Sequence, residues 1–547
     1  MNPSNDSSGP TFLRLFCVAL FSALVTAIVT WPQLLHPARV ADHFDPYFSV
    51  WRLGHIARAL GQWPIHLFDG NIFYPAKNTL AYSDATLLQG LLGAPLFWAG
   101  VSPTLIYNLL LYAGFVGSGV AMFVLAHHLT RATGPSLVAA AIFTMLPYRI
   151  EHLMHLELQW ALFIPLTFWA LHRTIETGRW RYALLTGLFG WLQFLSCIYY
   201  GVFLAMALVV FVPFLLLVEE HVPLRIFLPR LICAGILAGL LSLPYALPYV
   251  EASHAVGTRD VGQIAQFSAH PASYLATSAL NRTWGWTADR FGAQELRLFP
   301  GAMALLLATA SIRHSRRRVV LLYVVTTVVA VELSFGTNGF LYRWLLQHLP
   351  PLQGFRAIAR FGMLAGSATA VMAALGIQAL LTRIPEGSRW RRALVPMVLM
   401  VLAAEYSNRT VPLSRAISAT PADAYKAIAR AAEGAMVELP LPEIMPGFDP
   451  EYEAWSVWHG RPLLNGYSGF YPFAYLEAIN NLKGFPDAHS IETLRSLNVR
   501  YVMVHRGFYE PEKYTELALE IGAAPALKLW GTYKDPISFA DIFEVQP

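Results

Sequence analysis

The sequence predicts a polytopic α-helical membrane protein followed by a soluble α/β domain. Of its 547 residues, 55% are hydrophobic and only 13% are charged, whereas a soluble globular domain usually has about 25% charged residues. Apolar runs of the length that crosses a bilayer recur up to residue 404, and later apolar residues follow the spacing of strands and amphipathic helices. We therefore predict a cytoplasmic tail (1–11), a multi-span membrane domain (12–404) and an extracytoplasmic α/β domain (405–547).

Charge and cysteine content argue against a nucleic-acid surface, a disulfide framework and a cysteine-based zinc site. The formal net charge is only +5, and no lysine occurs between Lys77 and Lys426, so the sequence indicates no basic surface for nucleic acid. Cys17, Cys197 and Cys233 lie in apolar runs without metal-ligand spacing, so neither a disulfide framework nor a zinc site is expected. The partner that the composition does predict is the lipid bilayer.

The first apolar run, Thr11–Trp31, has the length of a membrane span. It lacks a small-residue cleavage site before Pro32, so we interpret it as an uncleaved span rather than a signal peptide. A long loop rich in acids and aromatics, Gln33–Leu88, follows it. Ala85–Gly100 is apolar but short and contains Pro95, which favours a helix in the membrane interface or a re-entrant segment over a span.

Further apolar runs bring the predicted number of spans to about 11. They lie near Val101–Leu129, Pro135–Leu146, Leu158–Leu171, Tyr182–Cys197, Val202–Val218, Leu231–Tyr249, Leu298–Ile312, Val319–Phe335, Ala357–Leu381 and Ala393–Glu405.

The loops between these runs predict an orientation. Short arginine-rich loops, such as the one around Arg316, alternate with loops poorer in positive charge, and the positive-inside rule places the arginine-rich loops in the cytoplasm. The N-terminus is then cytoplasmic. The outward segments are 33–88, 147–156, 251–297, 336–355 and 405–547.

The pattern after Tyr406 is that of a soluble α/β domain. Its predicted elements are a helix Ala422–Ala432, a strand Ala435–Leu439, a helix Ser490–Leu497 capped by Ser490, a strand Arg500–His505 and a hairpin from Ala526 to Val545.

The stretch Glu451–Pro472 in this domain is rich in aromatic residues. Two interpretations stay open. The aromatic side chains either pack in the core or form a face on which a sugar or an acceptor docks.

Several short stretches carry a resemblance to a known family. A first span, a long outward loop that opens with acids, interfacial helices and many uneven spans resemble the C superfamily of membrane glycosyltransferases (GT-C), which includes protein mannosyltransferases, oligosaccharyltransferases and lipid A aminoarabinose transferases. The following stretches are similar to those of large bacterial membrane proteins grouped with these enzymes: Asp45–Trp51 (DPYFSVW), Asn71–Pro75 (NIFYP), Phe355–Phe361 (FRAIARF) and Asn465–Phe470 (NGYSGF).

The resemblance implies an inverting transfer of a sugar from a polyprenyl-phosphate carrier to an acceptor. It also implies that the transfer takes place on the outer face of a bacterial inner (cell) membrane, and that an acid after the first span acts in catalysis. The acceptor is left open between a glycan, a lipid and a protein.

The residues of the first loop supply candidates for the base that such a transfer needs. Asp45 is the first candidate and Asp42, about one turn away, is the second. The alternative for Asp45 is helix capping, because Asp before Pro suits a helix start and Tyr47–Leu60 has the pattern of an amphipathic helix. We interpret Asp84, which precedes an apolar run, as a helix-start residue.

The outward segment Pro147–Glu157 places further ionisable groups between two short spans. Charged groups at membrane depth are costly, which favours a functional role. The resemblance implies a second acid from this loop, Glu151 or Glu157, that orients the base or holds a metal. Arg149 is a candidate ligand of the donor phosphate.

A divalent metal ion is the one cofactor considered. His152, His155 and Glu157 are its candidate ligands, but the His-x-x-His pair lacks the i, i+4 spacing of a zinc-binding helix. The alternative is hydrogen bonding in the membrane interface.

Arg356 and Arg360 begin the span Ala357–Leu381 at its outer end, four residues apart and so on one helical face. Cations are disfavoured at a helix N-terminus, which suggests an anionic partner, and arginine suits phosphate oxygens. The alternative is snorkelling to lipid head groups. Further candidates in the outward loop 251–297 are Arg259, Arg282 and Arg290.

Two other classes of function stay open besides a transferase. A transporter or flippase of lipid-linked sugars would also present arginines and acids near the membrane, but it should show internal repeats or charge at the midplane. The ionisable residues here concentrate in the outward loops instead. A non-catalytic protein of envelope-glycan assembly is the third possibility.

Overall fold

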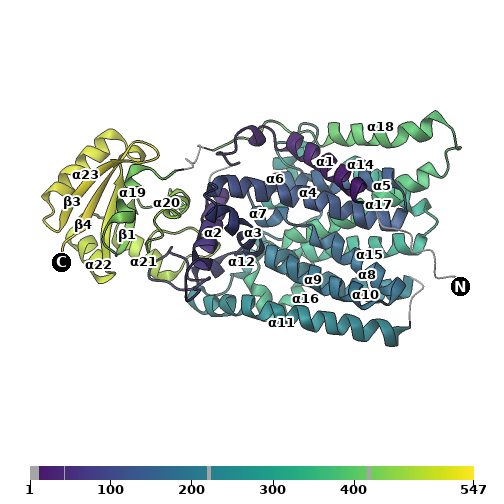
Figure 1. Cartoon of the computed structure of the whole chain (residues 1–547), viewed down its shortest axis with the longest axis horizontal. Coiled ribbons are helices and arrows are strands. Elements are labelled where there is room, and N and C mark those ends of the chain that lie inside the picture. Colours follow the sequence, from purple (N-terminus) through teal and green to yellow (C-terminus); the bar gives the residue numbers. More distant parts are fainter. Residues whose placement is uncertain (1–10, 42–43, 219–222, 415–419) are drawn as a thin grey trace. The chain divides into compact units, whose positions relative to one another are not determined.

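The computed structural model describes residues 11–41, 44–218, 223–414 and 420–547 (Figure 1). Within these ranges the chain is mostly helical and has one four-stranded sheet near its C-terminal end. This confirms the predicted class, a helical membrane protein with a C-terminal α/β part. The candidate base Asp42 lies outside the described residues.

Internal contacts divide the chain into two compact units, and each is described by itself. The helical unit consists of residues 1–35, 111–243 and 258–411, and the sheet unit consists of residues 36–110, 244–257 and 412–547. Most of the predicted loop 33–88 therefore belongs to the same unit as the C-terminal sheet.

Five helices of the described ranges are long and apolar enough to cross a membrane. They are α1 (Phe12–Val29), α4 (Pro103–Thr130), α10 (Ile198–Val218), α11 (Leu224–Val256) and the segment Ile358–Leu381, which contains η9 (Ile358–Phe361) and α17 (Gly362–Leu381). The other predicted spans form shorter or more polar helices, so the number of about 11 stays a prediction. These helices are α5 (Thr133–Met145), α8 (Phe163–Thr177), α9 (Trp180–Ser196), α14 (Ala302–Ala310), α15 (Arg317–Ser334) and α18 (Arg389–Glu405).

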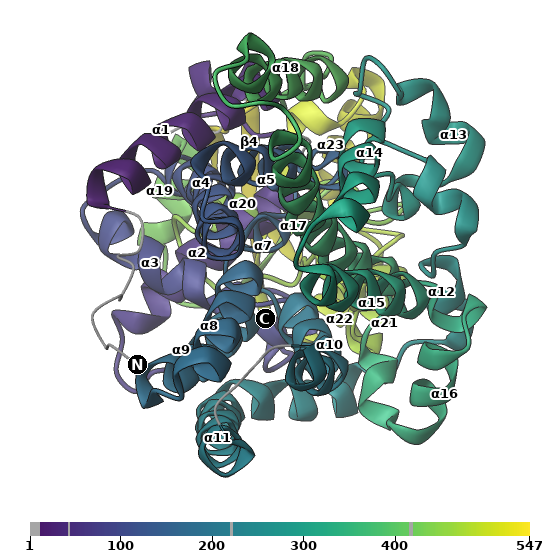
Figure 2. The ribbon, with the colours of Figure 1, turned by 90° about the vertical axis from the view of Figure 1, so that its right-hand side faces the viewer.

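Helix α17 is the centre of the helical unit. It packs against α5, α14 and α15, and Figure 2 shows it in the middle of these helices. Small residues allow the close approach, as in many membrane helix interfaces. A Cβ atom added at Gly376 would lie 1.8 Å from the Leu307 carbonyl oxygen of α14, so only glycine fits there.

Short helices connect the longer ones of the helical unit. Two of them, α6 (Pro147–Glu151) and α7 (Leu156–Gln159), lie between α5 and α8. The others are α12 (Val261–Gln266), α13 (Ala288–Phe291), the 3-10 helix η5 (Gln294–Leu296) and α16 (Leu341–His348).

The sheet has the strand order β1-β2-β4-β3. Strands β1 (Ala435–Leu439) and β2 (Val499–His505) are parallel, whereas β4 (Phe539–Val545) is antiparallel to both β2 and β3 (Leu527–Lys534). The predicted strands and hairpin are therefore confirmed to within one residue for β1 and β2.

Two cores cover the two faces of this sheet. Val437 and Val502 belong to the core that includes α22 (Ala488–Ser496), and Met436 and Met503 belong to the core that includes α19 (Asp423–Arg430). Neighbouring strand residues thus face opposite cores, as the period of a strand requires. The remaining helices of the sheet unit are α2 (Asp45–Leu60), α3 (Leu87–Trp98), α20 (Asp449–Ser456), α21 (Phe473–Asn481) and α23 (Pro511–Ala523).

Two predictions about helix ends are wrong. Helix α22 is capped by Asp487, whose side chain accepts a hydrogen bond from the Ser490 backbone N–H, and not by Ser490. Helix α2 begins with Asp45 as its first helical residue, and its N-cap is Phe44 without a side-chain hydrogen bond. Asp45 is therefore not the N-cap that the alternative reading of the sequence required.

Candidate active site

The segment between α5 and α8 is folded into the helical unit. Pro147 is the first residue of α6, a position at which the missing N–H of proline costs no hydrogen bond within the helix. Arg149, Glu151 and His152 follow and are buried, with exposed fractions of 1%, 7% and 1%. Three of the predicted site residues thus lie inside the protein, where charged groups need partners.

Glu151 pairs with Arg297, which is not among the candidates predicted from the sequence. Arg297 Nη1 donates a hydrogen bond to Glu151 Oε1 at 2.6 Å, and Arg297 Nη2 donates to Asp289 Oδ1 at 3.0 Å. The side chains of Arg297 and Glu151 are 12% and 6% exposed, whereas that of Asp289 is 95% exposed. The buried ion pair is therefore Glu151–Arg297.

A second buried ion pair joins Glu295 in η5 to Arg360 in η9. Arg360 Nε donates to Glu295 Oε1 at 2.8 Å, and the Arg360 guanidinium lies over the Tyr199 ring at 4.6 Å from its centroid. Burial by itself would raise the pKa of the Glu295 carboxyl, but the Arg360 guanidinium, as the largest opposing cause, brings this pKa down to about 2. Glu295 is therefore ionised at neutral pH.

Glu295 and Arg297 end the predicted outward loop 251–297, immediately before the apolar residue Leu298. A Glu-x-Arg pattern at the membrane end of a loop is a signal that could have drawn attention to both residues, since ionisable groups are costly there. Their partners, however, come from two other segments of the chain.

Arg356 and Arg360 do not share an α-helical face, so this part of the prediction is wrong. Arg356 precedes η9, and α17 begins only at Gly362. The Arg356 guanidinium lies over the Phe267 ring at 5.2 Å, and its backbone N–H donates to the Tyr199 hydroxyl at 3.3 Å. Tyr199, rather than a shared helix, contacts both arginines.

Arg259 adds positive charge near Arg356. Its backbone N–H donates to the Gln353 carbonyl oxygen at 3.2 Å. Burial and, after it, the charge of Arg356 lower the pKa of the Arg259 guanidinium to about 10. An anion placed between two such groups would relieve their repulsion, so this corner of the helical unit is suited to an anion.

Arg149 is held by acceptors of the protein itself. Its guanidinium donates to the carbonyl oxygens of Phe143 and Gly114, and to both the side chain and the carbonyl oxygen of Gln159, at 2.7 to 3.4 Å. It also lies over the Phe115 ring at 4.3 Å. These contacts favour a role in fixing α4, α6 and α7 to one another over the predicted phosphate binding.

His152, His155 and Glu157 do not fit a metal ion as they lie. Among the described residues, no three imidazole, thiolate or carboxylate groups are placed to hold one. His152 Nδ1 is 3.9 Å from Glu295 Oε2, and the His152 ring is 4.4 Å from that of Tyr148. Glu157 is buried in α7. We therefore assign no chemical step to a metal.

The sheet unit contains Asp45. The Tyr467 hydroxyl donates to Asp45 Oδ1 at 3.1 Å, and the Tyr467 ring packs edge-on against Phe48 at 5.6 Å. The Tyr467 backbone N–H donates to the buried carboxyl of Glu453. These contacts fix the position of Tyr467 and give the carboxylate of Asp45 a defined orientation.

Three of the four stretches that carry the family resemblance meet in this unit. Trp51 Nε1 donates to Asn71 Oδ1 at 2.8 Å, and the Phe73 backbone N–H donates to the Asn465 carbonyl oxygen at 3.1 Å. Segments 45–51, 71–75 and 465–470 are therefore direct neighbours. The fourth stretch, 355–361, belongs to the helical unit.

The aromatic stretch Glu451–Pro472 divides between the two interpretations that the sequence left open. Tyr452 and Trp455 belong to a core of the sheet unit, which confirms core packing for these two side chains. Tyr467 instead contacts the candidate base Asp45.

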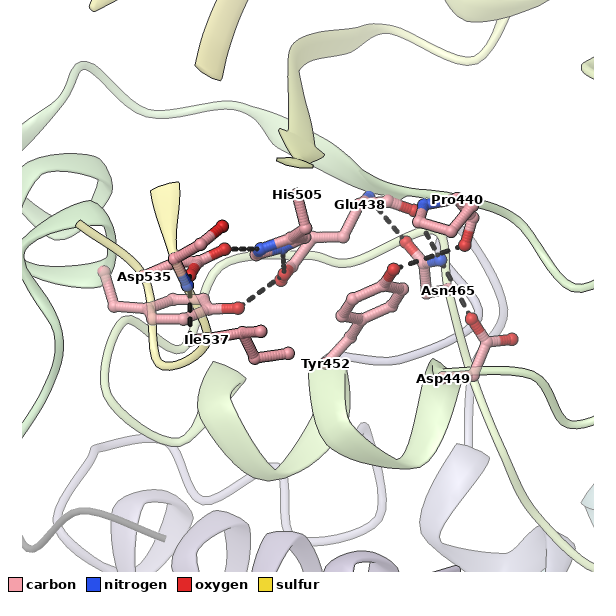
Figure 3. Close-up of polar contacts among 10 residues, drawn as sticks. Glu438, Pro440, Asp449, Tyr452, Asn465, His505, Asp535 and Ile537 are labelled. Atoms are coloured by element: carbon pink, nitrogen blue, oxygen red, sulfur yellow. Dashed lines mark hydrogen bonds and ion pairs between the residues drawn. The ribbon is translucent and has the colours of Figure 1, made fainter. Parts of the chain in front are cut away.

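A buried polar network in the sheet unit was not predicted. Figure 3 shows His505, at the end of β2, between two carboxylates: Nδ1 is 2.8 Å from Asp535 Oδ2 and Nε2 is 2.7 Å from Glu438 Oε2. The Tyr425 hydroxyl donates to the same Glu438 oxygen at 2.6 Å. Burial by itself would lower the pKa of His505, but its bonds to Asp535 and Glu438 raise it to about 8. The charged imidazole thus ties β1 and β2 to the turn after β3.

Comparisons with known proteins give weak similarities only. Neither a protein-family model nor a curated protein matches the sequence. Among solved structures, the archaeal oligosaccharyltransferase AglB from Archaeoglobus fulgidus, in complex with an inhibitory peptide and a dolichol-phosphate, is 13% identical with a TM-score of 0.47, over 96% of this chain and 74% of that chain.

Two further structures match at the same level. The apo form of the Archaeoglobus fulgidus oligosaccharyltransferase is 12% identical with a TM-score of 0.48, over 89% of this chain and 69% of that chain. ArnT from Cupriavidus metallidurans, bound to undecaprenyl phosphate, is 12% identical with a TM-score of 0.48, over 97% of each chain. At TM-scores below 0.5 these similarities assign no activity, which has to be inferred from the residues themselves.

Proposed function

We propose that this protein is a membrane glycosyltransferase that moves a sugar, with inversion, from a polyprenyl-phosphate carrier to an acceptor at the outer face of a bacterial cell membrane. The observation that carries the proposal is the pair of buried ion pairs Glu151–Arg297 and Glu295–Arg360. Buried ion pairs are weak contributors to stability, so their presence near the ends of apolar helices favours a functional role.

The arginines have the role of phosphate ligands in this proposal. The leaving group of the transfer is a lipid phosphate, and a guanidinium can bind two of its oxygens at once. Arg356 and Arg259 supply positive charge at one place. Arg360 is oriented by the ionised carboxylate of Glu295, and this pair sets the position of the positive charge before the donor arrives.

Asp45 has the role of the general base. It takes the proton from an acceptor hydroxyl, whose oxygen attacks the anomeric carbon from the face opposite the phosphate. The new glycosidic bond forms while the bond from carbon to phosphate oxygen breaks, so the configuration inverts. The Tyr467 hydroxyl holds the Asp45 carboxylate in place, and Glu151 is the second acid of the proposed reaction.

The experiment that tests the proposal compares envelope glycans by mass analysis in cells with and without the gene. The loss of a sugar from one glycan, together with accumulation of the lipid-linked donor, is the expected result. Unchanged glycans and an unchanged donor pool would overturn the proposal.

A second assay separates transfer from transport. A detergent-solubilised enzyme should still move the sugar from the extracted lipid-linked donor to the acceptor, because glycosyl transfer does not require an intact bilayer. A flippase moves a lipid between the two leaflets of a bilayer, so it shows no activity in detergent. Glycan loss in cells without transfer by the solubilised protein would therefore favour the transporter.

A further inference from the structure

Helices α1, α5 and α18 enclose a groove of about 500 Å³ inside the helical unit. Both α1 and α18 pack against α5, and Figure 2 shows the three helices next to one another. The walls of the groove are apolar and include Leu24 and Ile28 of α1, Met145 of α5 and Leu399 of α18. Leu24 and Ile28 are 62% and 63% exposed, so the groove is open along the apolar surface of α1.

One end of the groove is basic. Arg282 and Arg409 both line it, together with Trp31 and Asn408. Arg282 Nε donates to the Asn408 carbonyl oxygen at 2.8 Å, and the Arg409 backbone N–H donates to the Leu280 carbonyl oxygen at 2.7 Å. The two segments thus run side by side and bring both guanidinium groups to the same end.

These arginines retain donors for a ligand. Within the described ranges, the Arg409 guanidinium makes no hydrogen bond or ion pair, and Arg282 uses only its Nε atom. The side-chain amide nitrogen of Asn408 is buried and has no hydrogen-bond partner among the same residues. Arg282 and Arg409 are exposed, so their unused N–H groups are accessible to a ligand. The buried amide nitrogen of Asn408 is the donor that is costly to leave without an acceptor.

We propose that this groove binds one chain of an anionic membrane phospholipid, with the phosphate between Arg282 and Arg409. The apolar walls match a hydrocarbon chain, and the basic end matches a phosphate. Trp31 directly follows the C-cap of the apolar helix α1, and tryptophan is enriched at the ends of membrane helices. The groove lining contains neither a carboxylate nor an imidazole, so it offers no base for chemistry. A lipid that stays unreacted therefore fits it better than the sugar carrier does.

The bound lipid would join the first and the last apolar helices of the helical unit. Helix α1 and helix α18 each contact α5, and a hydrocarbon chain in the groove would fill the space that both of them line. This role is independent of the proposed glycosyl transfer.

Native mass spectrometry of the purified full chain in detergent tests the proposal. The probes are phosphatidylglycerol and phosphatidylcholine with identical acyl chains. Phosphatidylglycerol should bind more tightly. Arg409→Gln should weaken its binding about tenfold or more, because a hydrogen bond to a charged group is lost, and Arg282→Gln together with Arg409→Gln should weaken it further.

The matched control is Arg392→Gln, which removes an equal charge from the other end of α18 and should leave binding unchanged. Ala403→Trp, which fills the groove and keeps both arginines, should abolish binding of phosphatidylglycerol while the melting temperature stays near that of the parent. Equal binding of the two lipids, or equal losses in Arg392→Gln and Arg409→Gln, would overturn the proposal. Displacement of phosphatidylglycerol by an equal concentration of polyprenyl phosphate would also overturn it and assign the groove to the sugar carrier.

Discussion

Arg360 donates a hydrogen bond from Nε to Glu295 Oε1 at 2.8 Å, and both side chains are almost completely buried. Removing one partner of a buried ion pair typically costs about 3–5 kcal/mol, because the other charge is left without a counter-ion. Glu295→Gln should therefore lower the melting temperature of the purified protein in detergent. Glu295→Gln combined with Arg360→Met should recover most of this loss.

Asp289→Asn is the control for this pair, since its side chain is 95% exposed and its change should be close to silent. A Glu295→Gln variant as stable as the parent would show that the pair is not fixed in the folded protein.

Arg356 is expected to bind the donor phosphate through two hydrogen bonds. Arg356→Lys keeps the charge but loses the planar fork that matches phosphate oxygens, so the apparent donor affinity should fall even for this mild change. Titration of transfer rate against lipid-linked donor measures it, and Arg343→Lys, at an exposed position of α16, is the matched control. An unaltered donor affinity in both Arg356→Lys and Arg356→Ala would assign Arg356 to packing on Phe267.

Asp45 is expected to act as the base, and its position in α2 allows a substitution to separate catalysis from helix capping. Because Asp45 is the first helical residue and not the N-cap, Asp45→Asn should leave the helix and the amount of protein in the membrane unchanged. Loss of a positioned base lowers the rate by about 10²–10⁴-fold, and transfer should fall on that scale.

Two further variants complete this test. Tyr467→Phe should reduce transfer less than Asp45→Asn, because it removes only the hydrogen bond that orients the carboxylate. The sequence predicts Asp84 as a helix-start residue, but α3 begins at Leu87 with Thr86 as its N-cap. Asp84→Asn should be nearly silent, because the Asp84 side chain accepts the Thr86 backbone N–H before α3 and asparagine can keep this bond. Full activity of Asp45→Asn would move the search for the base to Asp42, Glu151 or Glu157.

His505 predicts a loss of stability at alkaline pH. Its pKa is about 8 in the folded protein and 6.5 as an ordinary imidazole, so the folded state binds the proton more tightly. The stabilisation, about 2 kcal/mol, is complete below pH 6.5 and is lost as the pH rises through 8. The melting temperature of the full chain should fall over this range.

His505→Gln should flatten this part of the pH profile, because no proton is then bound between Asp535 and Glu438. Burial raises the pKa of Asp449 to about 7. Its ionisation therefore lowers the stability of the folded protein mainly below pH 7, and this effect can be separated from that of His505, which continues up to pH 8. A parallel profile in the parent and in His505→Gln would contradict the assignment.

The predicted topology places the sheet outside and the arginine-rich loops inside. Single cysteines at Leu519, which is 72% exposed in α23, and at Ser315, between the arginines before α15, report on the two sides in a chain whose own cysteines are replaced. In intact cells a membrane-impermeant thiol reagent should label the first and not the second. The opposite labelling would reverse the orientation and remove the proposed site from the outer face.

Local sequence patterns were sufficient for much of the fold. Apolar runs predicted the helices, because the length and apolar composition that a membrane helix needs are properties of one continuous stretch of sequence. Alternation predicted β1 and β2, since adjacent residues such as Val502 and Met503 must face opposite cores. Residue types, together with the family resemblance, also singled out Asp45 and the segment around Glu151 as candidates, and their roles in catalysis stay predictions.

The partners of these residues were decided only by the tertiary structure. Glu151 meets Arg297 across 146 residues of sequence, and Glu295 meets Arg360 across 65. Such pairs depend on how helices pack, and no local pattern encodes that packing. For the same reason the sequence predicts Arg149 as a phosphate ligand, whereas the structure shows its donors bound to Gln159 and neighbouring carbonyl groups. Residue types determined which groups could carry charge, and the packing of distant segments determined which of those charges face each other.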